Sequence, residues 1–63
     1  MIKPSVSVML SSAECLAEQV DAVLTMWLEL CKDKDESAAL GALVTINHET
    51  LKTIRAAMLE VAA

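Results

Sequence analysis

The sequence predicts an all-α fold, an antiparallel helical hairpin that dimerises into a four-helix bundle. Three observations support this prediction. Apolar residues recur at alternating steps of four and three in each half of the chain, which is typical of one stripe along a helix. A single dense polar run separates the two halves. The 63 residues are 56% hydrophobic but contain only one Gly and one Pro, which leaves too few turns for a β-sandwich, a β-barrel or an alternating β/α sheet.

The first helix is expected at about residues 11–32. Ser11 and Glu14 have the spacing of an S-x-x-E capping box, which favours a start near Ser11. Residues 1–10 are then an arm, either extended or an early part of the helix, because residues 5–8 alternate like a strand while the apolar residues also keep helical spacing. The apolar stripe of this helix consists of Met9, Ala13, Leu16, Val20, Val23, Trp27 and Leu30.

The polar run Lys32–Ser37 contains the expected loop, at about residues 33–36, and the second helix is expected at about residues 37–62. Either Asp33 or Asp35 would cap this helix, with Glu36 beside its positive end. Its apolar stripe consists of Leu40, Val44, Asn47, Leu51, Ile54, Met58 and Val61. The whole of residues 11–63 is expected to form one domain.

A short loop makes the two helices antiparallel neighbours. A turn centred near Lys34 would bring Trp27, the only aromatic residue, close to Gly41, where a missing side chain leaves room for an indole. Asn47 is a polar residue within an apolar stripe. It either fixes the register of the helices or reaches the rim of the stripe with its amide.

Both helices carry more apolar surface than one hairpin can bury. The first has a second row, Leu10, Ala17, Leu24 and Cys31, and the second has a row of Ala39, Leu43, Ile46, Thr50, Thr53 and Ala57. Such excess marks an interface. We therefore expect a homodimer, with a permanent heteromeric partner as the alternative. The residues expected at the oligomer interface are Leu24, Met26, Trp27, Leu28, Ala39, Leu40, Leu43, Val44, Ile46 and Asn47.

Charged residues form two rows with the same four-then-three spacing. Glu14, Glu18 and Asp21 lie on the first helix, and His48, Lys52 and Arg55 lie at matching heights on the second. The antiparallel arrangement pairs Glu14 with Arg55, Glu18 with Lys52 and Asp21 with His48. The acids should point too far back for easy contact within one hairpin, so pairing between hairpins, or with a larger protein, is at least as favoured. The alternative is a solvated face that keeps an oily helix in solution.

No residue pattern indicates catalysis, a cofactor or a metal. The only His is followed directly by Glu49, which departs from the Glu-x-x-His spacing of carboxylate metal sites in bundles. Cys15 and Cys31 are sixteen positions apart on one helix, roughly 24 Å, which is too far for a disulfide within the chain. Buried free thiols are expected, with a disulfide between two chains as the alternative. Uncharged stretches are shorter than the ~20 residues of a membrane span, and a cytoplasmic protein is expected.

These features predict a non-enzymatic protein that acts through protein–protein interaction, as an adaptor, a small chaperone or an inhibitor of a larger protein. In layout and length the chain also resembles the plasmid copy-control protein Rop, a short helical hairpin that dimerises into a bundle and binds RNA. That resemblance implies a nucleic-acid-binding regulator as an alternative, although the net charge of −4 argues against phosphate binding. A third alternative is an inhibitor whose acidic helix imitates nucleic acid.

Overall fold

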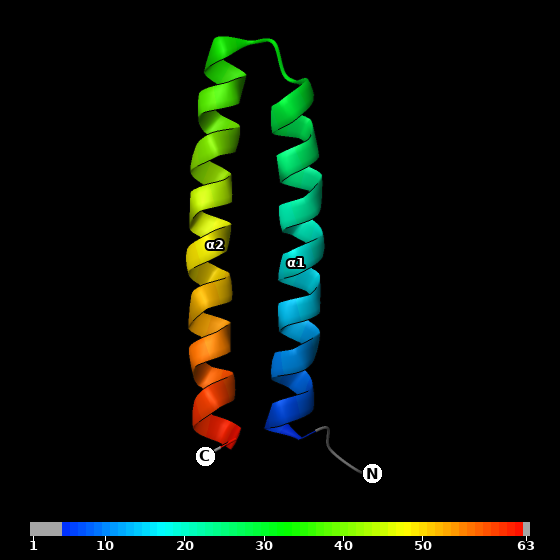
Figure 1. Ribbon diagram of the computed structural model, residues 1–63, viewed down its shortest axis with the longest axis vertical. Helices are drawn as coiled ribbons and strands as arrows, with labels where there is room; N and C mark the ends of the chain where they lie inside the picture. Colours follow the sequence, from blue (N-terminus) through cyan, green and yellow to red (C-terminus); the bar gives the residue numbers. More distant parts are fainter. Residues whose placement is uncertain (1–4, 63) are drawn as a thin grey trace.

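The fold is an antiparallel hairpin of two long helices, as the sequence predicts. The computed structural model describes residues 5–62, in which α1 (Val6–Leu30) and α2 (Lys34–Ala62) lie side by side along their whole length. Residues 31–33 connect the two helices at one end of the hairpin. The start of α1 and the end of α2 lie next to each other at the other end (Figure 1). No described helix is long and apolar enough to cross a membrane.

The first helix begins earlier than Ser11. Ser5 is its N-cap, and the Ser5 hydroxyl accepts a hydrogen bond from the Val8 backbone N–H at 3.1 Å. Because this cap satisfies one of the free donors of the first turn, residues 6–10 continue the helix and the capping box at Ser11 is wrong. The helical spacing that also runs through these residues was the correct signal. Residues 1–4 of the expected arm lie outside the described residues.

The connection lies earlier in the chain than the expected residues 33–36, because α1 ends at Leu30 instead of near residue 32 and Asp33 caps α2. Its carboxylate accepts a hydrogen bond from the Glu36 backbone N–H at 3.0 Å, and its carbonyl accepts one from Ser37 at 2.9 Å. The cap is therefore Asp33 rather than Asp35, and α2 begins at Lys34 instead of near Ser37. The acidic residues Asp35 and Glu36 occupy the first turn, where the helix dipole favours negative charge.

The stripe of α2 that faces α1 is the predicted one. Leu40 and Leu51 are buried, with 3% and 5% of their surface exposed, and Val44, Asn47, Ile54 and Met58 are half-buried. Val61, at the end of the stripe, is exposed. The 4-and-3 spacing thus gave the phase of α2 over all but its last turn.

The stripe of α1 that faces α2 is not the expected one. Its buried position is Ala17, and Leu10, Leu24 and Cys31 of the second apolar row are half-buried beside it. In contrast, six members of the expected stripe are exposed, namely Met9, Leu16, Val20, Val23, Trp27 and Leu30. Turning α1 in this way places Glu14 and Asp21 against basic residues of α2 and puts the small Ala17 side chain at the helix contact.

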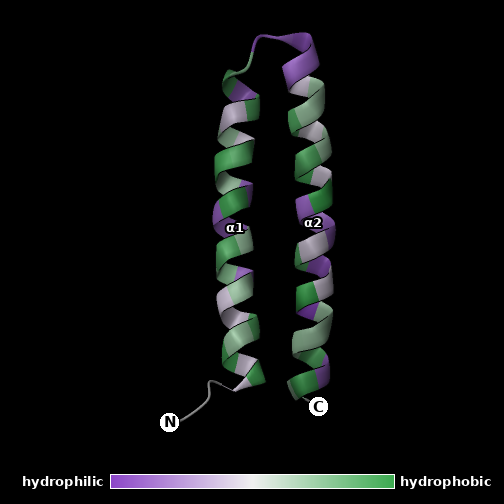
Figure 2. Ribbon diagram, turned by 180° about the vertical axis from the view of Figure 1, so that it is seen from behind, coloured by the Kyte–Doolittle hydropathy of each residue, from purple (hydrophilic) through white to green (hydrophobic). Residues whose placement is uncertain are grey.

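The hairpin forms a single layer of helices. Its extents are 48, 23 and 13 Å, and the shortest of these is close to the ~10–12 Å diameter of one helix with its side chains. Two broad faces, one on each side of the layer, are therefore open. In Figure 2, apolar residues extend over most of α1, and hydrophilic residues form the connection and the first turn of α2 as well as bands near the middle of both helices.

Asn47 ties the two helices together near the middle of the layer. Its amide nitrogen donates a hydrogen bond to the backbone carbonyl of Ala17 at 2.9 Å in a partly buried position. This carbonyl already accepts the ordinary helical hydrogen bond of α1, so it uses a second lone pair for Asn47. The contact fixes the height of α2 against α1, in agreement with the register interpretation.

Substitutions at Asn47 test whether this residue sets the register of the helices at a cost in stability. We expect Asn47→Leu to raise the midpoint of thermal unfolding, followed by circular dichroism, because the Ala17 carbonyl keeps its helical partner while the seam gains apolar contact. Asn47→Asp is the matched control. It preserves shape but turns an acceptor toward the carbonyl, and it should cost about 1–3 kcal/mol. A clear loss of stability in Asn47→Leu would contradict the interpretation.

Candidate interaction faces

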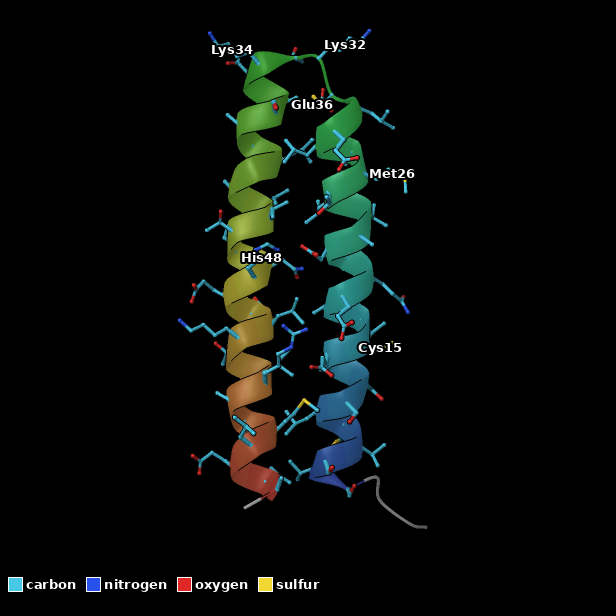
Figure 3. The ribbon with its side chains drawn as sticks, viewed as in Figure 1. Cys15, Met26, Lys32, Lys34, Glu36 and His48 are labelled. Atoms are coloured by element: carbon cyan, nitrogen blue, oxygen red, sulfur yellow. The ribbon has the colours of Figure 1, made fainter. Side chains whose placement is uncertain are left out.

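One open face of the hairpin carries ion pairs between the helices. Arg55 donates from Nε to Glu14 at 2.9 Å, and its Nη2 lies 3.8 Å from the Glu18 carboxylate. Nearer the connection, His48 Nε2 lies 2.8 Å from Asp21 Oδ1. His48 extends from α2 toward α1 on this side (Figure 3). We call this surface the charged face, and it consists of Glu14, Glu18, Asp21, His48, Lys52 and Arg55.

Two of the three predicted pairs are confirmed within one hairpin, Glu14 with Arg55 and Asp21 with His48. The third is wrong, because Glu18 lies beside Arg55 instead of Lys52. The expectation that the acids point too far back is also wrong, since α1 is turned about a quarter turn from the predicted orientation. The side chains of His48 and Arg55 are more than half exposed, so each pair contributes at most about 1 kcal/mol and mainly orients the helices.

The opposite open face is apolar on α1. Leu16, Val20, Val23 and Trp27 all lie here, with Val23 61% exposed and Trp27 49% exposed. The first three line a shallow open groove together with Gln19, Leu24 and the Trp27 ring. This row with 4-and-3 spacing has the pattern of a helix-packing stripe, yet within one described hairpin it remains exposed over nearly the full length of α1.

The second helix also carries a row of small and apolar residues outside the seam, from Ala39 to Ala57, and this row lies on the same side of the layer as the exposed α1 row. The indole nitrogen of Trp27 donates a hydrogen bond to the Glu36 carboxylate at 2.9 Å, which marks the side of α2 that Trp27 faces. Leu43 and Ile46 follow Glu36 on that side by helical spacing, and both are exposed. The ion pairs of Asp21 and His48 occupy the other side. We call this second surface the apolar face: it consists of Met9, Ala13, Leu16, Val20, Val23 and Trp27 on α1 and Ala39, Leu43, Ile46, Thr50, Thr53 and Ala57 on α2.

The polar groups of Trp27, Thr50 and Thr53 on the apolar face already have partners inside the hairpin. The Trp27 indole N–H donates to Glu36, which borders this face. The hydroxyls of Thr50 and Thr53 donate to backbone carbonyls of their own helix at 3.0 and 2.9 Å. Burial of these groups under another protein would therefore leave none of them without a hydrogen-bond partner, which removes the main cost of covering them.

The residues expected at an oligomer interface divide into two groups. Five of them lie in the seam between the two helices of one hairpin: Leu24, Leu28, Leu40, Val44 and Asn47. The other five are exposed: Met26, Trp27, Ala39, Leu43 and Ile46. Met26 projects from the outer edge of α1, away from α2 (Figure 3).

Trp27 does not pack on Gly41 as expected. A β-carbon added at Gly41 would have no heavy atom within 4 Å, so the indole lies elsewhere. The physical reason is the hydrogen bond to Glu36, which holds the ring near the first turn of α2, together with the rotation of α1 that moves Trp27 out of the seam. No sequence pattern singled out Glu36 as this partner.

Both cysteines are free thiols, but only one is shielded. Cys15 is exposed, which corrects the expectation that it is buried, because it lies on the part of α1 turned away from α2. Cys31 is half-buried at the end of α1 and its thiol donates to the Asp33 carbonyl at 3.4 Å. Within residues 5–62, no three His, Cys, Asp or Glu side chains come together in a way that would hold a metal ion.

The hydrogen bond between Trp27 and Glu36 gives a direct test of the apolar face. The chain has one Trp, so its indole N–H gives a single NMR signal. We expect Glu36→Ala to speed hydrogen exchange at this N–H by about tenfold, because the acceptor is lost, whereas Glu36→Gln keeps an acceptor oxygen. Asp35→Ala is the matched control, since it removes the same charge from the same turn. Equal exchange in all four proteins would refute the contact.

No protein family matches the chain, and neither a curated protein nor a solved structure matches it. The assignment of function therefore depends on the two faces: a charged face whose acids have partners within the hairpin, and an apolar face left open.

Proposed function

We propose that the protein acts through protein–protein association, and that two hairpins stack on their apolar faces to form a four-helix bundle. The observation that carries this proposal is the apolar row of α1, which has the spacing of a helix-packing stripe and is exposed in one hairpin. The bundle is then a non-enzymatic module, an adaptor, small chaperone or inhibitor that presents its outer surfaces to a larger protein.

The small interior of the single hairpin supports association. Only Ala17, Leu40 and Leu51 are buried among the described residues, and chains of this length are marginal even when they form a compact core. Stacking a second layer would bury the Trp27, Val23 and Leu43 side chains as well. Each large apolar side chain that becomes buried contributes about 1.5–3 kcal/mol, so a few of them would exceed the contribution of all the ion pairs.

The apolar face extends along most of the hairpin. Its α1 row runs from Met9 to Trp27 and its α2 row from Ala39 to Ala57, each over about five turns of helix. A standard protein–protein interface buries about 800 Å² on each partner, so a stable complex would use most of this face.

The distribution of charge also favours this face. None of the twelve residues of the apolar face is ionisable, whereas Glu14, Glu18 and Asp21 lie on the opposite side of the layer. Apart from Glu36, which borders the face beside Trp27, two apolar faces therefore meet without like charges opposite one another, despite a net charge of −4 on each chain. In the bundle both charged faces point outward, where they are open to a larger partner.

Substitution at the centre of the α1 row tests the proposal. We expect the wild-type chain to sediment as a dimer at micromolar concentration, and Val20→Glu to raise the dimer dissociation constant by about 100-fold or more, because a carboxylate would be buried without a partner. Sedimentation equilibrium measures both, with circular dichroism to confirm that the variant remains helical.

Ala22→Glu is the matched control, because it adds the same charge to the same exposed helix outside the apolar face. It should dimerise like the wild type. A wild-type chain that is folded and monomeric at these concentrations would overturn the proposal, as would a Val20→Glu variant that dimerises normally.

A further inference from the structure

The two rows of the apolar face match each other in spacing when read in opposite directions. From Trp27 back to Met9 the α1 row steps by four, three, four, three and four residues, and from Ala39 forward to Ala57 the α2 row takes the same steps. Since the helices are antiparallel, the two rows run in the same direction in space and remain in step throughout.

Contacts within the hairpin place the matching members at the same height. Ala17 lies beside Asn47, and Glu14 beside Arg55, which sets the level of one helix against the other. By the constant rise of an α-helix, Trp27 is then level with Ala39. In the same way Val23 is level with Leu43, Val20 with Ile46, Leu16 with Thr50, Ala13 with Thr53, and Met9 with Ala57.

Two hairpins can stack face to face around a two-fold axis in two ways. An axis parallel to the helices keeps the connections at the same end and lays α1 of each copy over α2 of the other. An axis across the helices puts the connections at opposite ends and lays α1 over α1 and α2 over α2. Both arrangements make all neighbouring helices antiparallel, so side-chain size must decide between them.

The sizes of the side chains favour the first arrangement. The α1 row is bulky, with Trp27 and Met9 at its ends, whereas the α2 row has Ala39 and Ala57 at the matching levels. With α1 over α2, the largest residue meets the smallest at each end and the layers stay evenly spaced. With α1 over α1, bulky residues meet on one side and small ones on the other, which leaves clashes and voids in the same interface.

We propose that the occupant of the apolar face is a second copy of this chain, stacked with both connections at the same end, so that Trp27 of each copy packs over Ala39 of the other. This inference rests on the proposed self-association and adds its geometry. The bond to Glu36 holds each indole in place before the copies meet and satisfies its N–H. Trp27 is therefore a preformed anchor, and Ala39 is the space that receives it.

Distances between spin labels test the arrangement. In a Cys15→Ser, Cys31→Ser background, a label is attached at Lys34→Cys, beside the connection, or at Leu59→Cys, near the other end of α2 and on the side away from the apolar face. Stacking with the connections together predicts Lys34–Lys34 distances of about 20–30 Å between copies. Mixed dimers labelled at Lys34 in one chain and Leu59 in the other should instead give a distance approaching the 48 Å length of the layer.

The reverse result, long Lys34–Lys34 and short Lys34–Leu59 distances, would overturn this inference while leaving the proposed dimer intact. Absence of any distance between labelled chains at micromolar concentration would overturn both. A signal only after another protein is added would show a heteromeric occupant, which also contradicts the inference.

A size exchange tests the anchor itself. Ala39→Leu fills the space above which Trp27 of the other copy lies, so it should raise the dimer dissociation constant about tenfold. Adding Trp27→Leu to this variant should restore most of the affinity. Ala42→Leu is the matched control, because it is exposed on the same helix but off the apolar face. If Ala39→Leu dimerises as well as the wild type, Trp27 does not pack there.

Discussion

The structure depends on one choice, which stripe of α1 faces α2. A two-helix layer buries a single stripe from each helix, and α1 has two apolar stripes about a quarter turn apart. The stripe centred on Ala17 faces inward, where a small side chain lets Asn47 reach the α1 backbone. Everything else follows from this rotation. The acids of α1 turn toward Arg55 and His48 on one side, and the bulkier stripe turns to the other side, where none of residues 5–62 covers it.

The two faces that result have different roles. On the charged face, Glu14 and Asp21 contact Arg55 and His48 within the hairpin in positions that remain open to water, so these contacts orient the helices at little gain in free energy. On the apolar face, the hydrogen-bonding groups of Trp27, Thr50 and Thr53 are satisfied locally, and the surface left over is almost entirely hydrocarbon. Polar contacts thus set the register of the hairpin, whereas in the proposed dimer the driving force would be the apolar area removed from water.

The sequence was sufficient to predict two antiparallel helices joined by a short polar connection, the inward stripe of α2, and the heights of the Glu14–Arg55 and Asp21–His48 pairs, but not the residues at which the helices begin. It misled on the phase of α1, because 4-and-3 spacing reveals that a stripe exists but not which partner it meets. The signal that could have decided was present: Glu14 and Asp21 match Arg55 and His48 in height, and they touch only if α1 is rotated toward them. The roles of Ser5 and Glu36 depend on backbone and ring positions that periodicity does not encode.

The short connection also determines the order in which the hairpin closes and opens. The contact between Trp27 and Glu36 spans only nine residues of chain, the Asp21–His48 and Ala17–Asn47 contacts span 27 and 30, and the Glu14–Arg55 pair spans 41. Once one contact has formed, the chain segment that remains to be closed for the next contact is shorter, so the loss of entropy on forming that next contact is smaller. The helices should therefore associate first next to Asp33 and then progressively further from the connection. Local unfolding should begin at the opposite end of the hairpin, and the contacts around Trp27 should separate last.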